Sequence, residues 1–105
     1  MLIHDAIIGN LYPYDVDENL ILKVCIDYDV SPEDVYLSET KEVVARVSIE
    51  ILANLLSLSS ESDSGYSLTY NADKLKERIC FIARSNGLAD IVDEYDSKPK
   101  VYIIQ

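Results

Sequence analysis

Hydrophobic residues recur at helical spacing in four segments of the chain. The pattern is clearest in residues 20–28, where apolar side chains stand at positions i, i+3, i+4 and i+7 and so share one face of a helix. Residues 43–58 are apolar over much of a helical circumference, which predicts a central helix packed on several sides. The four predicted helices span residues 2–8, 20–28, 38–58 and 71–86.

Residues that favour helix ends stand at the borders of these segments. Side-chain oxygens favour the start of a helix, and glycine or asparagine favours its end because the closing residue adopts a left-handed conformation. A single helical turn is also predicted at 31–34, where a proline follows a serine, and a short last turn at 88–92. The predicted caps are, in chain order, Gly9-Asn10, Asp15 or Asp17, Ser38, Asn71 or Asp73, and Asn86-Gly87.

Three segments depart from the helical pattern. Residues 59–65 are polar and rich in serine, which predicts a mobile, exposed loop. Residues 66–70 alternate with period two and predict a short extended segment or hairpin, and the tail 97–105 is predicted to be extended, with a strand near 100–104. We expect these extended segments to form an interface through Tyr66, Leu68, Tyr70, Val101, Tyr102 and Ile103.

Length and composition place the pattern in a single domain. The chain has 105 residues, of which 49% are hydrophobic, and this supplies one core but not two. Its apolar runs are far shorter than the roughly 20 residues that cross a bilayer, and its first residues show no signal-peptide pattern. We therefore predict a mainly α, small helical bundle over residues 1–105 that stays in the cytoplasm and makes no membrane contact.

Charge is unevenly distributed along the chain. Residues 1–63 carry 13 acidic and 3 basic side chains, and residues 64–105 carry 6 of each, so the first part accounts for the whole net charge of −10. Nucleic-acid binding draws its affinity from Lys and Arg side chains that displace counterions from phosphates. An acidic surface repels phosphates, and we therefore expect no specific binding to DNA or RNA.

The residue types needed for catalysis, for a cofactor or for a metal do not occur in a suitable pattern. His4 is the single histidine, and the sequence contains no Gly-x-Ser-x-Gly elbow to present a serine to it, so a structural histidine is expected. Three scattered glycines do not make a phosphate-binding loop. Cys25 and Cys80 with one histidine fall short of a four-ligand zinc site and are expected to be buried thiols. We expect a protein that is not an enzyme and holds no cofactor or metal.

Tyrosine dominates the aromatic residues, with eight copies beside one phenylalanine and no tryptophan. Its apolar body and polar tip suit both the border of a small core and a wet protein interface. Two alternatives follow. Either the tyrosines surround the core, or some of them face a partner, namely some of Tyr12, Tyr14, Tyr66, Tyr70 and Tyr102.

The order in which the predicted helices, turns and extended segments follow one another can be compared with that of known protein families. A proline-aromatic turn, Leu11-Tyr12-Pro13-Tyr14, follows the first short helix and leads to a helix with acidic caps, Asp17 to Tyr28. A long apolar helix, Val44 to Leu56, precedes a polar loop and a Gly-aromatic-Ser stretch, Gly65 to Tyr70. A helix ending near Gly87 and a short extended tail complete the order. Over nearly the whole chain, this order resembles the small head–tail connector (adaptor) proteins of long-tailed bacteriophages, particularly prophage-type versions carried by gut Bacteroidetes.

The resemblance implies a structural subunit that forms a homo-oligomeric ring between the portal and tail proteins of a virion. A closed ring needs two different faces on each subunit that meet head to tail. The extended segments would add to a neighbour's sheet or groove, and the acidic first part would line a channel through which DNA slides. The alternative is a small acidic interaction or regulatory module with no virion role, whose charge suits a basic partner.

Overall fold

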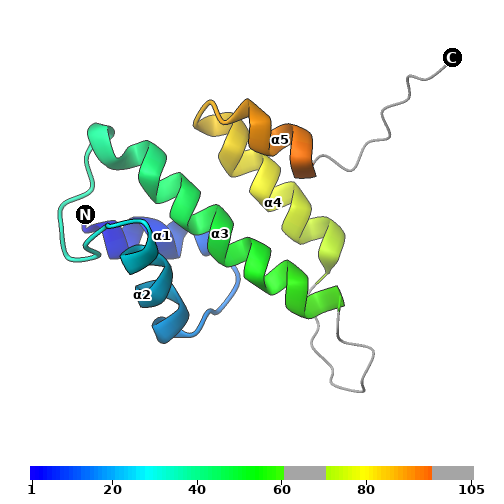
Figure 1. The fold of residues 1–105 in the computed structure, drawn as a ribbon, viewed down its shortest axis with the longest axis horizontal. Coiled ribbons are helices and arrows are strands. Elements are labelled where there is room, and N and C mark those ends of the chain that lie inside the picture. Colours follow the sequence, from blue (N-terminus) through cyan, green and yellow to red (C-terminus); the bar gives the residue numbers. More distant parts are fainter. Residues whose placement is uncertain (61–70, 96–105) are drawn as a thin grey trace, which may run out of the picture.

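One long helix organises the fold. The computed structural model describes residues 1–60 and 71–95. Within them α3 runs through the middle of the molecule, with α1 and α2 on one side and α4 and α5 on the other (Figure 1). The central position predicted for this segment is therefore confirmed, as is the mainly helical fold. The elements are α1 (Ile3–Leu11), α2 (Glu18–Asp27), the 3₁₀ helix η1 (Ser38–Thr40), α3 (Lys41–Ser60), α4 (Ala72–Ser85) and α5 (Ala89–Tyr95).

The core lies between α3 and the helices around it. Each fully buried aliphatic side chain contributes roughly 1.5–3 kcal/mol of hydrophobic stabilisation, so the apolar helical stripes hold the bundle together. Leu58, at the end of the predicted α3 stripe, is instead 46% exposed because the flanking helices do not cover that end. The buried stripe residues are Ile3, Ile7 and Leu11 in α1, Ile21, Val24 and Cys25 in α2, Val44, Val47, Ile51 and Leu55 in α3, and Leu75, Ile79, Ile82 and Ala83 in α4.

Side-chain caps begin two of the helices, and in each case one of the two predicted alternatives is correct. The Asp17 carboxylate accepts a hydrogen bond from the Asn19 amide at 3.2 Å at the start of α2. The Asn71 side-chain oxygen accepts one from the Lys74 amide at 3.1 Å at the start of α4. Each acceptor satisfies a backbone donor that has no partner within its helix.

The predicted cap at Ser38 is wrong, because a turn of 3₁₀ helix precedes α3. Ser38 is the first residue of η1, and Leu37 stands at its N-cap. The Leu37 amide donates to Thr40 Oγ1 at 3.0 Å, and the Thr40 amide donates to the Leu37 carbonyl at 3.0 Å. Thr40 therefore takes over the capping role expected of Ser38.

Helices α2 and α4 end in the same hydrogen-bonded arrangement. After α4, Gly87 has φ +71°, and the Leu88 amide donates to the Ala83 carbonyl at 2.9 Å. After α2, Asp29 has φ +59°, and the Val30 amide donates to the Cys25 carbonyl at 2.8 Å. Both ends are Schellman motifs, in which one left-handed residue reverses the chain. The predicted end of the fourth helix at Asn86-Gly87 is thus confirmed.

The predicted cap at Gly9-Asn10 is wrong, since α1 continues through both residues to Leu11. Leu11 is 1% exposed, and its burial extends the helix beyond the glycine. The helix closes at Tyr12, which precedes Pro13 through a cis peptide bond. A proline cannot continue the helical hydrogen-bond ladder, so Pro13 sets the limit that Gly9 was expected to set.

The segment between α2 and η1 crosses back over the N-terminus. At 31–34, where one helical turn was predicted, the chain forms a turn closed by the Asp34 amide and the Ser31 carbonyl at 3.1 Å. Val35 then pairs with Leu2 in an isolated antiparallel β-bridge. The predicted last turn at 88–92 is the longer helix α5.

Several predicted elements lie outside the described residues. Helix α3 reaches Ser60, so residues 59 and 60, which were predicted to begin the loop 59–65, are helical, and the rest of that predicted loop lies outside the described part. The extended segment at 66–70, the tail 97–105 and its strand near 100–104 also lie outside it. Over residues 1–60 and 71–95, no helix is long and apolar enough to span a membrane.

Candidate functional site

All six side chains of the predicted interface, Tyr66, Leu68, Tyr70, Val101, Tyr102 and Ile103, lie outside the described residues. Candidate sites among the described residues therefore have to be built from other side chains. Three features stand out: a polar contact around His4, an exposed apolar patch at the N-terminus, and a groove beside α4.

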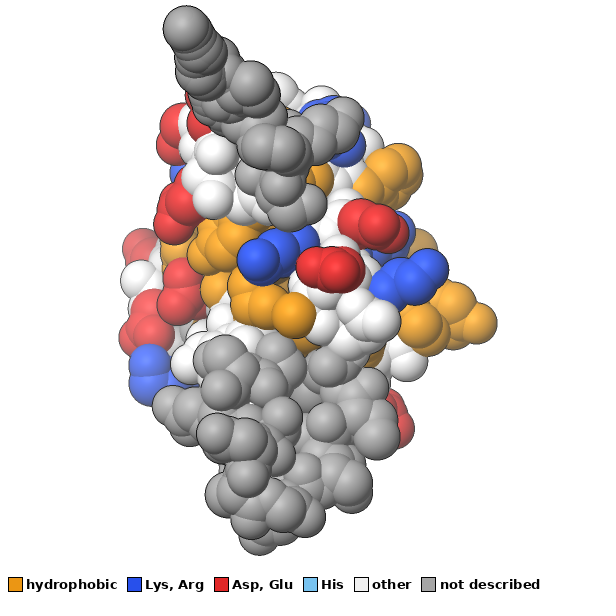
Figure 2. Space-filling view, turned by 90° about the vertical axis from the view of Figure 1, so that its right-hand side faces the viewer, with side chains coloured by type: hydrophobic (Ala, Val, Ile, Leu, Met, Phe, Trp, Pro, Cys, Tyr) orange, Lys and Arg blue, Asp and Glu red, His pale blue; other side chains and the backbone are white. Residues whose placement is uncertain are grey.

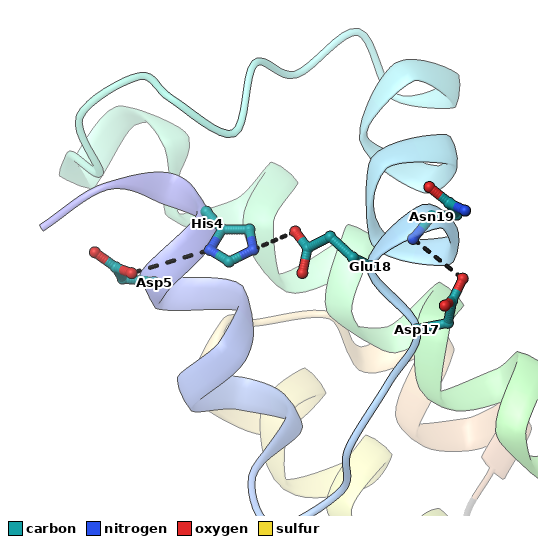
Figure 3. A network of polar contacts seen from close by, with 5 residues as sticks. All are labelled: His4, Asp5, Asp17, Glu18 and Asn19. Carbon is teal, nitrogen blue, oxygen red and sulfur yellow. Dashed lines mark hydrogen bonds and ion pairs between the residues drawn. The ribbon is translucent and has the colours of Figure 1, made fainter.

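His4 joins α1 to the start of α2. Its Nε2 lies 2.5 Å from a Glu18 carboxylate oxygen, and its Nδ1 lies 4.0 Å from an Asp5 carboxylate oxygen (Figure 3). About a third of the His4 side chain is exposed. The contact ties the first turns of two neighbouring helices together, which is the structural role expected of this histidine.

Both cysteines are buried thiols that form no disulfide, as predicted. Burial raises the pKa of the Cys25 thiol above its usual value, and the nearby carboxylate of Glu18 adds to the effect. A raised pKa keeps the thiol protonated and unreactive at neutral pH. Within the described part of the chain, no three His, Cys, Asp or Glu side chains gather where a metal ion could be held.

The N-terminal patch consists of Met1, Leu2, Val35 and Leu37. These four side chains are between 42% and 75% exposed. Two backbone hydrogen bonds hold the patch together, from Ile3 to the Asp34 carbonyl and from Tyr36 to the Met1 carbonyl, both at 2.8 Å. No pattern in the sequence predicted this patch as a surface, although the alternation of Val35 and Leu37 was a signal for an extended segment.

The second surface, the aromatic groove, lies between the turn after α1 and the outer face of α4. It is an open depression of about 550 Å³. Tyr12 is 74% exposed and Phe81 is 56% exposed, so aromatic rings reach solvent here. Phe81 was missed because it stands off the inward stripe of α4. The groove is lined by Tyr12, Pro13, Tyr14, Asn71, Lys74, Glu77, Arg78 and Phe81.

Arg78 fixes the shape of the aromatic groove. Its guanidinium donates hydrogen bonds to the carbonyls of Asn10, at 3.0 Å, and Gly9, at 3.3 Å. These carbonyls belong to the last turn of α1, where they lack helical partners and carry partial negative charge. The same guanidinium lies 5.2 Å from the centre of the Phe81 ring, within the range of a cation–π contact. Arg78 thus connects α4 to α1 and orients the exposed phenylalanine.

The side of the molecule formed by α4 and α5 differs from the acidic first part. Figure 2 shows hydrophobic side chains on this side among both acidic and basic ones. Helix α4 supplies Lys74, Lys76, Arg78 and Arg84 against two acids, Asp73 and Glu77. The described surface is therefore acidic around α2 and mixed around α4.

Most of the described tyrosines border the core, which was one of the two predicted alternatives. Four of them, Tyr14, Tyr28, Tyr36 and Tyr95, are partly buried against the core, whereas Tyr12 is exposed. Tyr28 and Tyr95 line a polar hollow of about 190 Å³ between α3 and α5. Burial raises the pKa of both phenols, and the carboxylate of Glu50 adds to the effect.

Comparison with known proteins identifies a family but no characterised relative. A search of the curated proteins and a search of the solved structures find no match. The sequence profile of one family, described as a family of unknown function (DUF6706), matches residues 1–105. Because that match covers the entire sequence, the chain belongs to the family of unknown function DUF6706.

Proposed function

We propose that this protein is a non-catalytic structural subunit that works by binding other proteins, copies of itself among them. The observation that supports the proposal is the pair of surfaces with exposed hydrophobic side chains at the two ends of α1. The N-terminal patch lies at the start of this helix, and the aromatic groove lies at its end. A helix of nine residues is about 13 Å long, so the two surfaces are separate.

Two different apolar surfaces on one subunit suit head-to-tail association. In such an assembly each copy uses one surface toward the copy before it and the other surface toward the copy after it, and the chain of contacts closes into a ring when the rotation permits. A symmetric dimer needs only one surface that matches itself. The pair of surfaces therefore favours the ring over the dimer as the form of self-association.

The specific setting that we propose is a head–tail connector of a phage or prophage, placed between portal and tail proteins. The proposal rests on the order of elements along the chain and on the two surfaces described above. The acidic residues around α2 and the loop after it would line the channel, where repulsion lets DNA pass without adhering. In this setting the protein resides in the virion and, before assembly, in the cytoplasm.

The charge distribution favours one further candidate function, that of a small acidic module that docks on a basic protein outside any virion. With 13 acids and 3 bases in residues 1–63, such a module would be attracted to a basic partner over long range. It would remain monomeric or dimeric, and it would bind its partner less tightly as salt rises.

Light scattering coupled to size-exclusion chromatography, over a range of protein concentrations, tests the proposal. We expect a species larger than a dimer that grows with concentration. The variants Leu37→Ser in the N-terminal patch and Phe81→Ser in the aromatic groove should each weaken association about tenfold, as the loss of a central apolar contact does. Leu22→Ser is the matched control, since Leu22 is 40% exposed on α2 and belongs to neither surface.

A chain that stays monomeric at all concentrations would contradict self-association and favour the acidic module. Capture of a single basic protein, lost in high salt, would then identify that alternative. The virion setting is tested separately by mixing the chain with portal and tail proteins encoded beside its gene. If the neighbouring genes encode no capsid, portal or tail protein, the connector role is wrong.

A further inference from the structure

The β-bridge at the N-terminus has one open edge. In an antiparallel pair, hydrogen bonds from the flanking residues leave the amide and carbonyl of the central residues pointing outward. Here the flanking bonds run from Ile3 to Asp34 and from Tyr36 to Met1, and the central residues are Leu2 and Val35. On the outer side, the Val35 amide and carbonyl form no hydrogen bond with any described residue. Val35 is 56% exposed, so this edge is accessible to another strand.

The surroundings of this edge are apolar and acidic. The exposed side chains of the N-terminal patch flank the edge. Acidic residues stand close to the patch residues in the sequence and outnumber the positive charges there, which are the Met1 amino group and Lys41. The exposed acids nearby in the sequence are Asp5, Glu33, Asp34 and Glu39. A strand that matches this surface would be apolar and would carry basic residues beside its apolar part.

The sequence of this chain contains such a strand-forming segment after α5. Val101-Tyr102-Ile103-Ile104 is a run of β-branched and aromatic residues, the types most favoured in strands. Lys98 and Lys100 come directly before it. Pro99, between the two lysines, disfavours helical angles at Lys98 and favours an extended chain. In apolar character and in charge, the segment complements the N-terminal patch.

We propose that residues 101–104 of one copy bind the open edge at Val35 in a second copy, as an added β-strand. Backbone hydrogen bonds to Val35 give the contact its direction, in the mode called β-augmentation. The apolar side chains of the strand cover the N-terminal patch, and Lys98 and Lys100 face the acids around it. The inference deepens the proposed function and rests on it, since it names the segment that joins neighbouring subunits.

The arrangement of the fold favours a second copy as the acceptor. Helix α5, from which the tail departs, lies on the opposite side of α3 from the N-terminus (Figure 1). The six residue steps from Tyr95 to Val101 span at most about 22 Å when fully extended. A tail bound to its own patch would have to pass around the bundle within that length. A tail bound to a neighbour meets no such obstacle, and it produces the head-to-tail contact that a ring requires.

A charge swap on the full-length chain tests this contact. The double variant Lys98→Glu/Lys100→Glu places like charges across the proposed interface and should weaken self-association by at least about tenfold in Kd. Adding Glu33→Lys/Glu39→Lys should restore association to within roughly threefold of the original chain, because the charge pairs are then reversed. The matched control adds Asp90→Lys/Asp93→Lys on α5 instead, which makes the same change in net charge away from the patch and should not restore association.

Cross-linking identifies the acceptor copy. A photoreactive residue is placed at position 103, and light and ¹⁵N-labelled chains are mixed before irradiation. We expect cross-links to residues 1–2 and 35–37, and we expect them between light and heavy chains. Cross-links to those positions within one chain only would overturn the assignment to a second copy.

The outcomes separate the two proposals. If the chain self-associates but the charge swap has no effect and cross-links fall elsewhere, the tail contact is wrong while the structural-subunit proposal stands. If the chain stays monomeric and forms no cross-link between copies, both proposals fail. Cross-links of position 103 to a different protein, with none to the N-terminal patch, would also refute the tail contact.

Discussion

At the residue scale, Ser48 stands out as the buried polar side chain in the apolar core formed by the described residues. Ser48 is fully buried in α3, where the hydrophobic pattern would place an aliphatic residue. Its hydroxyl donates to the Val44 carbonyl at 2.9 Å and accepts a hydrogen bond from the Asn10 side chain at 3.0 Å. The second bond joins α3 to the end of α1. Because the hydroxyl uses both its donor and an acceptor position, burying it costs little free energy.

The variant Ser48→Ala should lower the free energy of unfolding by roughly 1–2 kcal/mol, because the Asn10 amide loses its partner in a half-buried position. Urea titration followed by circular dichroism measures the change. Ser85→Ala is the matched control, since the Ser85 hydroxyl donates to the Phe81 carbonyl at the same 2.9 Å but on the exposed face of α4. The control should change stability by less than about 0.5 kcal/mol. Equal effects of the two variants would mean that the bond to Asn10 adds nothing.

At the scale of the element, helices α2 and α4 end in the same left-handed turn but have different residues at the left-handed position. The chain must adopt a positive φ after both α2 and α4 to close a Schellman motif. Gly87 does so without steric cost, whereas Asp29 carries a side chain in the same left-handed region. The space around Gly87 is open, with no atom within 4 Å of a Cβ built at that position. A side chain at position 87 would therefore lower stability only through the left-handed backbone angles that it must adopt.

Gly87→Ala should lower the free energy of unfolding by about 1–2 kcal/mol, the cost of left-handed angles for a residue with a Cβ. Asp29→Gly should raise it, by less than about 1 kcal/mol, because it removes that cost while loosening the unfolded chain. Thermal unfolding by calorimetry measures both. Gly9→Ala is the control: Gly9 lies inside α1 at ordinary helical angles, with open space around it, so alanine there should stabilise. Destabilisation by Gly9→Ala would show that the contrast does not come from φ.

At the scale of the whole molecule, the packing of α2, α3 and α5 affects the pKa of three titratable side chains. Cys25 is buried in the core, and Tyr28 and Tyr95 line the polar hollow between α3 and α5. Burial raises the pKa of all three groups, with negative charges nearby adding to it. Each group is neutral in its protonated form. The folded chain therefore holds these protons to higher pH than the unfolded chain does.

Stability should consequently fall at alkaline pH. The unfolded thiol loses its proton near its ordinary pKa of 9.0 and the unfolded phenols near 10.0, while the folded groups still retain theirs. The stabilisation is complete below these values and is lost as pH rises toward the raised pKa of each folded group. Urea midpoints measured from about pH 8 to about pH 11 should decline above pH 9. Tyr28→Phe/Tyr95→Phe should flatten the upper part of the decline, and an unchanged profile in that variant would contradict the assignment.

Much of the helical bundle follows from the sequence alone. The stripe through Ile21, Val24 and Cys25 and the broad apolar surface of α3 predict their own burial, because side chains that share a helical face must bury it together. The caps at Asp17 and Asn71 also follow from local chemistry. Two predicted caps were wrong. At Gly9-Asn10 the burial of Leu11 extends α1 beyond the predicted end, and at Ser38 the 3₁₀ turn η1 replaces the predicted cap.

The candidate surfaces could not be predicted in the same way. The aromatic groove depends on Arg78 reaching the carbonyls of Asn10 and Gly9, residues that lie 68 and 69 positions away in the chain. The exposed ring of Phe81 forms part of a groove only because the folded chain places the turn at Tyr12 beside it. The exposed groups of the N-terminal patch come from two segments that a single β-bridge joins.

The sequence by itself determined which helical faces this protein buries, and therefore that it is a mainly α bundle around one central helix. Helical periodicity and capping are local properties, readable over a few turns of chain. Only the tertiary structure decided which apolar side chains remain outside, because exposure depends on which helices happen to cover them. The surfaces that carry the proposed function arise where distant segments meet, and no local pattern encodes that meeting.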